Sequence, residues 1–255
     1  MLILLPPSEG KTAPASGSPV DLDSLTHPEL AGARRRVGDE LARVSGQRRA
    51  LTALGVGASL AHEVARNTTV WANPADAAAR VYSGVLYDAA GMTSWGADAL
   101  ERASRCVRIV SALWGVVTPT DRIPAYRLSM GTSLGSIGAL ATWWRPRLTG
   151  LLDAESDGGL IVDCRSSAYV AAYRPTASAW VPVAVQREVD GRRSVVSHHA
   201  KHTRGLLVRH LVENDLQPQT PEDLADAAAG MIGGAIRDVE LDAGRLTLVT
   251  RAQGG

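Results

Sequence analysis

Apolar residues recur along the chain with two different periods, and together these periods predict strands interspersed with helices. Mostly apolar runs, which are typical of buried strands, cover residues 1–5, 107–117 and 160–164. Alternating positions predict further strands at 180–186 and 193–197, joined by a turn at Asp190-Gly191, and a closing strand at 246–249. Apolar positions three and four residues apart predict helices over residues 28–66, 97–105, 139–152, 205–214 and 221–229.

The segments between these elements carry turn-forming residues. Pro, Gly and Ser dominate from Pro6 to about residue 21, and residues 119–127 form a second turn-rich loop. Residues 81–86 are expected to form a short strand or a turn, and Thr220 is expected to cap the helix that Pro221 opens. The chain has no internal repeat and no long linker. We therefore expect a single mixed α/β domain over residues 1–255 with a mixed sheet, whose strand order the sequence does not give.

Composition excludes several classes of protein. The chain has 255 residues, a formal net charge of +1, 45% hydrophobic and 21% charged residues, as an ordinary globular protein does. No apolar run approaches the roughly 20 residues that cross a bilayer, so we expect no membrane contact. The apolar start, Met1–Leu5, is too short for a signal peptide and lacks a basic flank. Cys106 and Cys164 cannot build a disulfide framework, which favours a cytoplasmic location.

Arginine accounts for all but two of the 27 basic residues, and those two are Lys11 and Lys201. GC-rich coding explains such a bias without any functional cause. A lysine amine can lose its proton when it is buried, which a guanidinium does not do. Lys11 and Lys201 are therefore candidates for chemistry, with chance as the alternative.

Residues 51–61 match an apolar–Gly–apolar–Gly hairpin between helical segments, which predicts a helix-hairpin-helix at about residues 38–66. Gly55, Val56 and Gly57 would let the backbone approach a phosphate closely, and the next helix would direct its N–H groups at that anion. Arg48 and Arg49 lie just before the hairpin. Such contacts bind the DNA backbone without reading its sequence. Alternatively, Gly55 only ends a helix and the arginines form a solvated face.

The segment from residue 191 to 212 is strongly basic. It holds Lys201 and four arginines, four histidines and no acid, and an acidic stretch follows it. This asymmetry favours a positively charged cleft for a phosphate-bearing partner, although a basic helix face paired with an acidic helix would look the same.

Three weaker motifs do not predict sites. His198 and His202 have the spacing of two metal ligands on one helix face but lack a third ligand, so we expect no metal and no other cofactor. Gly10-Lys11-Thr12 resembles the end of a phosphate-binding P-loop, but no helix follows it; a looser anion-binding role for Ser8 and Lys11 stays open. Residues 131–135 match Gly-x-Ser-x-Gly without the preceding buried strand that hydrolases require.

Several segments together resemble the YaaA family, which is named for peroxide stress. The matching motifs are Pro7–Thr12, Val81–Gly84, Leu113–Asp121, Pro124–Gly131, Trp144, Ser166–Tyr169 and Ala200–Leu206. The resemblance extends nearly end to end and includes both lysines. It implies a cytoplasmic α/β protein with a positively charged cleft. It also implies binding of duplex or branched DNA and protection against iron-driven oxidative damage during peroxide stress.

Two functions remain open from the sequence. The first is sequence-independent DNA binding, with Gly55, Val56, Gly57 and Ser8 at the phosphates and attraction from Arg48, Arg49, Lys201 and Arg204. The second is an enzyme acting on a nucleobase, nucleoside or nucleotide. Its candidate catalytic residues are Lys201, Lys11, Tyr82, Arg127 and Tyr169, with Lys201 as a nucleophile or general base and Arg127 or Arg204 as a phosphate clamp. The same polar residues would also suit hydrogen bonds that only hold loops in place. The oligomeric state is unknown.

Overall fold

A mixed eight-stranded sheet forms the framework of the computed structural model, which describes residues 1–189, 192–194 and 197–251. The sheet order is β11-β12-β9-β8-β1-β3-β4, and β10 pairs with β9. Its strands are β1 (Leu2–Leu5), β3 (Val107–Ser111), β4 (Gly115–Val117), β8 (Leu160–Asp163), β9 (Ala179–Val189), β10 (Arg192–Ser194), β11 (Asp238–Asp242) and β12 (Arg245–Arg251). The run from β12 through β9, β8 and β1 to β3 is parallel, whereas β4, β10 and β11 pair antiparallel. The prediction of a mixed sheet in an α/β protein is therefore confirmed.

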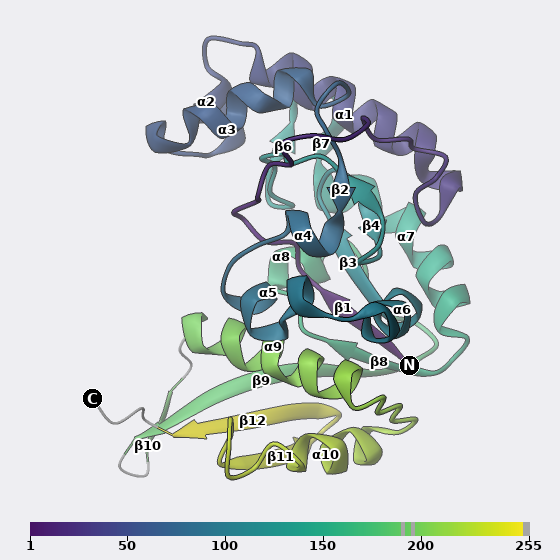
Figure 1. The fold of residues 1–255 in the computed structure, drawn as a ribbon, viewed down its shortest axis with the longest axis vertical. Coiled ribbons are helices and arrows are strands. Elements are labelled where there is room, and N and C mark those ends of the chain that lie inside the picture. The colour runs from purple at the N-terminus through teal and green to yellow at the C-terminus, as the bar shows by residue number, and fades with distance from the viewer. Residues whose placement is uncertain (190–191, 195–196, 252–255) are drawn as a thin grey trace.

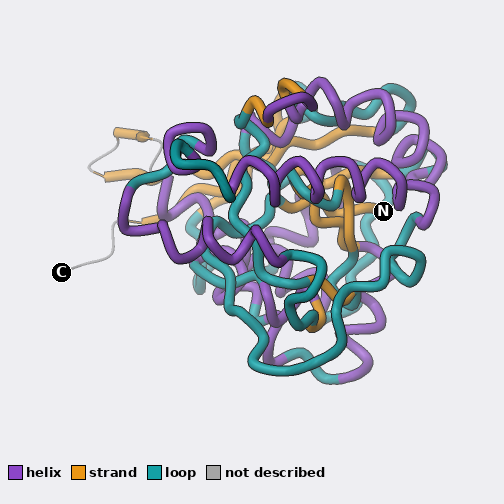
Figure 2. Tube along the Cα trace, turned by 90° about the horizontal axis from the view of Figure 1, so that it is seen from above, coloured by secondary structure: helices purple, strands orange, loops and turns teal. Residues whose placement is uncertain are grey.

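Helices flank the sheet at both ends of the molecule (Figure 1). They are α1 (Ala31–Ser45), α2 (Ala50–Leu54), α3 (Ala61–Arg66), α4 (Ala78–Val81), α5 (Val85–Ala90), α6 (Ala97–Cys106), α7 (Leu140–Ser156), α8 (Ser167–Val170), α9 (Ser197–Glu213) and α10 (Pro221–Ala229). Short 3-10 turns are η1 (Pro28–Leu30), η2 (Ala58–Leu60), η3 (Asn67–Thr69), η4 (Met92–Ser94) and η5 (Gly135–Ile137). Two small ladders pair β2 (Asp76–Ala77) with β5 (Arg122–Ile123), and β6 (Ser133–Leu134) with β7 (Gly138–Ala139). Seen from above, helices and loops cover most of the strands (Figure 2).

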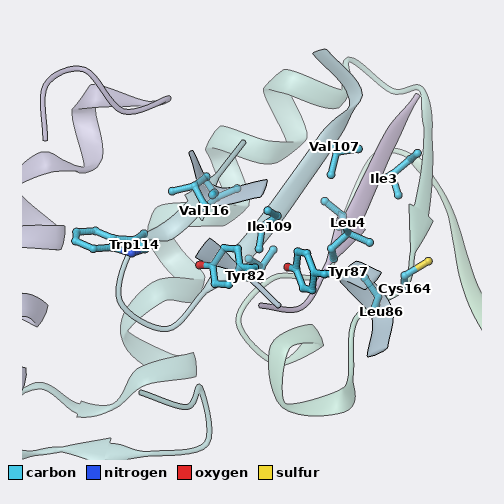
Figure 3. Packing of buried hydrophobic residues seen from close by; sticks show 14 of the residues in the cluster. Ile3, Leu4, Tyr82, Leu86, Tyr87, Val107, Ile109, Trp114, Val116 and Cys164 are labelled. Atoms are coloured by element: carbon cyan, nitrogen blue, oxygen red, sulfur yellow. The ribbon is translucent and has the colours of Figure 1, made fainter. Parts of the chain in front are cut away.

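The central strands are buried on both faces, which explains why apolar residues dominate them. Every residue of β1, β3 and β8 is buried. Ile3, Leu4 and Ile109 belong to one buried cluster with Tyr82 and with Leu86 and Tyr87 of α5 (Figure 3). Strands covered on both sides need no polar face, so alternation is absent there.

The predicted strand over residues 107–117 is wrong, because the chain folds back within it. The strands β3 and β4 are antiparallel neighbours joined by a turn. The side chain of Ser111 accepts the N–H groups of Leu113 and Trp114, and Gly115 has φ +73°. A Cβ at Gly115 would lie 2.6 Å from the ring of Trp144, so glycine is needed there for both space and conformation.

The predicted helix over residues 28–66 is interrupted twice. The first break follows α1 at Gly46, and the second follows α2 at Gly55, whose φ of +67° ends that helix. Arg34 in α1 is not solvated, because its guanidinium donates to the carbonyls of Thr26, His27, Trp114 and Val116. Propensity alone cannot reveal that a charged side chain is used to tie a helix to the β3–β4 turn.

The boundaries of the other elements differ less from the predicted ones. No strand forms at 81–86: α4 ends at Val81, α5 begins at Val85, and Tyr82 makes only an isolated bridge with Lys11. Helix α9 begins at Ser197, well before the predicted start at 205. The cap at Thr220 is confirmed, with Asp223 completing a capping box. The predicted turn at Asp190-Gly191 lies outside the described residues.

Candidate functional site

A pocket of about 340 Å³ opens where the parallel strands β1 and β8 end. The loop after β1 contributes Pro6 to Gly10, and the loop after β8 contributes Cys164 and Ser166. The carboxyl ends of neighbouring parallel strands meet at one edge of a sheet, so residues from both loops gather there. We call this the strand-end pocket.

Helix α9 brings two basic side chains to the strand-end pocket. Lys201 and Arg204 are three residues apart and therefore lie on one helix face. Arg204 donates from Nε and Nη2 to the carbonyl of Val183 at 2.9 and 2.6 Å. Lys201 is exposed, and no other described residue forms a hydrogen bond or ion pair with it.

The close approach of α9 to α5 fixes the position of these two side chains. Gly205 faces the backbone of α5, and a Cβ there would lie 2.2 Å from the carbonyl oxygen of Leu86. Any larger residue at position 205 must therefore push the helices apart. One glycine thus sets how deeply Lys201 and Arg204 enter the pocket.

Two tyrosines contribute rings to the pocket wall. The hydroxyl of Tyr87 donates to the carbonyl of Pro6 at 2.7 Å, which anchors the loop after β1. Burial raises the pKa of Tyr169 to about 12. Burial likewise raises the pKa of Tyr87 well above its usual value. Both phenols are neutral at physiological pH and present flat, uncharged surfaces.

Lys11 lies under the same loop. Its Nζ donates to the carbonyls of Ser8 and Glu9 at 2.8 and 3.4 Å and lies 4.2 Å from the ring centroid of Tyr126. Burial, and to a lesser extent the charge of Arg127, lower the pKa of Lys11 to about 7 against the opposing effect of Glu63 and Glu9. Lys11 therefore supports the pocket loop and is only partly charged near neutral pH.

Arg127 reaches the same loop from the opposite side. It donates to the carbonyl of Glu9 at 3.1 Å and forms ion pairs with Glu9 at 3.3 Å and Glu63 at 3.5 Å. The Glu9 side chain is 79% exposed, so the Glu9 pair is weak and open to competition by another anion.

A smaller hollow of about 150 Å³ lies beside the strand-end pocket, at the turn after α2. Leu54, Gly55, Val56 and Arg127 line it. Ser8, Glu9, Ser129 and Tyr169 line both this hollow and the strand-end pocket, so the two spaces are neighbours that share part of their walls. We call the smaller space the hairpin hollow.

The turn after α2 leaves backbone donors without partners. Gly55 and Val56 return their N–H groups to α2. The N–H groups of Gly57, Ala58 and Ser59 find no acceptor within the described residues. Consecutive free amides of this kind suit an anion.

The predicted site residues are only partly brought together. Ser8, Tyr169, Lys201 and Arg204 line the strand-end pocket, and Gly55, Val56 and Arg127 line the hairpin hollow. Lys11 lies beneath the shared loop. Tyr82 is buried, with its hydroxyl 3.0 Å from that of Tyr126, and lines neither space. Arg48 and Arg49 are exposed next to α2 and line neither space.

The sequence reasoning missed Glu9, Tyr87, Cys164 and Ser166 as wall residues. Cys164 and Ser166 directly follow a predicted buried strand, and this position was the available signal. Cys164 is fully buried, and burial raises the pKa of its thiol to about 12, so it is no nucleophile.

No group of three or more His, Cys, Asp or Glu able to hold a metal ion occurs among the described residues. The side chain of His198, half of the predicted His198–His202 pair, lies outside them. Within the same residues, no helix is both long enough and apolar enough to span a membrane.

The fold and site are those of an α/β protein with a ligand-sized pocket at the carboxyl ends of parallel strands. The chain belongs to the family described as peroxide stress protein YaaA, which it matches over residues 1–231. It is 41% identical over 230 residues to a UPF0246 protein of Streptomyces coelicolor, covering 89% of this chain and 88% of that protein. It is also 40% identical to one of Corynebacterium efficiens, covering 98% of this chain and all of the relative. A Burkholderia mallei relative is 31% identical, covering 90% of this chain and 91% of that protein. The family name supports a role in peroxide stress.

The burial of Lys11 predicts a pH-dependent stability. Between the folded pKa of about 7 and the ordinary value of 10.5, the unfolded chain binds a proton that the folded chain has lost. Stability contributed by this residue therefore rises with pH, by up to about 1.4 kcal/mol per pH unit. Urea unfolding at pH 7, 8.5 and 10 should show that Lys11→Met removes this rise. The other lysine supplies the control: Lys201→Met should keep it, and equal slopes in both variants would contradict the prediction.

Proposed function

We propose that the protein binds DNA without sequence specificity as part of the peroxide-stress response, and that it limits oxidative, iron-driven damage to that DNA. The observation that carries the proposal is that the hairpin hollow and the strand-end pocket share part of their walls, because this brings together residues predicted independently from distant segments. Gly55 and Val56 come from the turn after α2, Arg127 from the loop after β5, and Lys201 and Arg204 from α9.

The charges along this path favour a polyanion. Arg127, Lys201 and Arg204 outnumber Glu9, the acid that lines the two spaces. Arg48 and Arg49 extend the basic surface beside the turn, where the free amides of residues 57–59 supply neutral donors. A phosphate backbone running from this turn to α9 would find donors at each step, as in a helix-hairpin-helix next to a positively charged cleft.

Salt dependence tests the proposal. Fluorescence anisotropy with a labelled duplex should show affinity falling steeply with salt, with a slope of about 0.9 per neutralised phosphate. The double variant Arg48→Gln/Arg49→Gln should lower that slope by about 1.8. Arg105→Gln/Arg245→Gln, which removes two exposed charges elsewhere, is the matched control and should leave it unchanged. No binding, or a flat salt response, would refute the proposal.

Removing the acid at the rim should strengthen binding. Glu9 pairs with Arg127 and would compete with a phosphate for it. Because that pair is exposed, the gain from Glu9→Gln is modest, about two- to fivefold in affinity. The same anisotropy titration measures it, with Glu101→Gln on α6 as the control. A loss of affinity in Glu9→Gln would show that Glu9 holds the loop instead of opposing the ligand.

The presence of Lys201 and Arg204 in the wall of one pocket favours a second candidate, an enzyme acting on a nucleobase, nucleoside or nucleotide. In its covalent form, the Lys201 amine adds to C1′ of an abasic aldehyde and water leaves, giving an imine. Borohydride would reduce that imine to a stable protein–DNA adduct. Trapping that is lost in Lys201→Gln but retained in Lys11→Gln would support this candidate, and absence of trapping would exclude the covalent form.

A further inference from the structure

The strand-end pocket is larger than a contact to a DNA backbone requires. A backbone phosphate needs only a shallow surface with donors, such as the turn after α2 provides. Pockets of about 300–1,000 Å³ hold small molecules, and the strand-end pocket falls inside this range at about 340 Å³. The hairpin hollow, at about 150 Å³, falls below it.

The position of the pocket in the sheet is one that favours nucleotides. From β1 the chain reaches its next strand of this sheet, β3, on one side, and from β8 it reaches β9 on the other. The strand order therefore reverses between β1 and β8. In open parallel sheets, the crevice outside such a reversal is where mononucleotides and dinucleotides bind.

One end of the pocket suits a phosphate group. Arg204 is held by the carbonyl of Val183, so its orientation is fixed before any ligand arrives. No carboxylate among the described residues pairs with Lys201 or Arg204. Two unneutralised cations on one helix face, with the hydroxyl of Ser166 in the same wall, match the charge and hydrogen-bonding capacity of a phosphate monoester or diester.

The rest of the wall suits a flat, uncharged group. Tyr87 and Tyr169 line this part of the wall together with Pro6 and Leu86, and Cys164 lies buried there. Bases stack on aromatic side chains largely irrespective of their identity, because every base has a π face. A pocket that is cationic at α9 and flat and apolar elsewhere combines the two halves of a nucleotide.

We propose that the strand-end pocket takes one nucleoside monophosphate unit, with its phosphate at Lys201 and Arg204 and its base against the tyrosine-lined wall. The unit is either a free nucleotide or an unpaired nucleotide turned out of DNA that lies across the hairpin hollow. Binding of an unpaired nucleotide turned out of DNA rests on the proposed function, whereas binding of a free nucleotide does not.

Two titrations separate the sources. Isothermal titration calorimetry with dAMP and dGMP tests the free nucleotide. Anisotropy with a duplex carrying one unpaired nucleotide, compared with the same duplex fully paired, tests the DNA-borne unit. Because an unpaired base is the least costly to extrude, we expect about tenfold tighter binding of the bulged duplex.

A variant that fills the pocket tests the location. Ser166 lines the pocket, is exposed and makes no side-chain cap, so Ser166→Trp should fold and block the space. We expect this variant to lose the preference for the bulged duplex and any binding of free nucleotide, while it still binds the paired duplex, more weakly, through the turn after α2 and through Arg48 and Arg49. Ser167→Trp, at the exposed neighbouring position that does not line the pocket, should change neither result.

The outcomes are distinct. Equal binding of both duplexes together with no binding of dAMP or dGMP would overturn the inference and leave the DNA-binding proposal standing. Failure to bind the paired duplex would overturn the DNA-binding proposal. If dAMP or dGMP then binds to the wild type and to Ser167→Trp but not to Ser166→Trp, the pocket is assigned to a free nucleotide. A preference for the bulge that survives Ser166→Trp, with an unchanged melting temperature for that variant, would place the unpaired nucleotide elsewhere and overturn the inference.

Discussion

Replacing Arg165 with methionine is expected to lower the free energy of unfolding by about 3–5 kcal/mol, because it leaves Asp163 buried without its partner. The two side chains are 0% and 2% exposed, and Arg165 donates to both carboxylate oxygens of Asp163 at 2.8 and 2.7 Å. Arg165 also donates to the carbonyl of Tyr173 at 2.9 Å. Burial by itself would raise the pKa of Asp163, but the hydrogen bonds and charge of Arg165 hold it below its usual value.

This pair lies in the loop that leaves β8 for α8, so it also shapes the strand-end pocket. Urea unfolding measures the loss. In the double variant Asp163→Leu/Arg165→Met, part of the stability should return, because no charge is then left buried. Arg105→Met breaks the exposed pair with Glu101 and should cost less than about 1 kcal/mol. A loss of that small size in Arg165→Met would show that Asp163 finds water or another donor.

Gly205→Ala is expected to cost about 1–3 kcal/mol or more and to weaken ligand binding as well. The added Cβ would lie 2.2 Å from the carbonyl oxygen of Leu86 and 2.8 Å from the Cβ of Ala89. Because Leu86 presents backbone, it cannot yield by rotation of a side chain. Helix α9 must therefore move away from α5, and Lys201 and Arg204 move with it.

Gly150→Ala is the matched control, since Gly150 lies inside α7 and a Cβ there meets nothing within 4 Å. An alanine favours a helix over glycine, so this variant should be stabilised by up to about 1 kcal/mol. Unfolding titrations and DNA anisotropy on both variants give the comparison. Wild-type stability and affinity in Gly205→Ala would mean that α5 and α9 are packed less tightly than their backbone separation indicates.

Arg34 and Arg165 show where reading an arginine from sequence fails. Both belong to an arginine-rich background in which a solvated surface role is the ordinary expectation. In the folded chain both guanidinium groups are buried and saturated by carbonyls or a carboxylate. Their acceptors come partly from distant segments, such as Trp114 for Arg34, so no local pattern could identify them.

The candidate site likewise depends on contacts between segments that are far apart in the chain. The motif at residues 200–206 and the loop after the first strand were visible as candidates, and the turn at Gly55 was visible as an apolar–Gly–apolar–Gly pattern. That these segments line two neighbouring spaces with shared walls depends on the sheet order β9-β8-β1-β3, which the sequence did not reveal. Tyr82 was a candidate catalytic residue because it lies in a family motif. In the folded chain its hydroxyl is instead buried next to that of Tyr126.

The sequence by itself determined the elements whose signal is local: the apolar strand β1, the mostly apolar strand β8, the capped helix α10 and the alternation that makes the protein α/β. These depend on residue spacing, β-branched content and capping chemistry within a few positions. The tertiary structure alone decided the fold-back between β3 and β4, the early start of α9 and the meeting of Ser8, Tyr169, Lys201 and Arg204. Those features depend on contacts between residues far apart in the chain, whose energies do not appear in any local pattern.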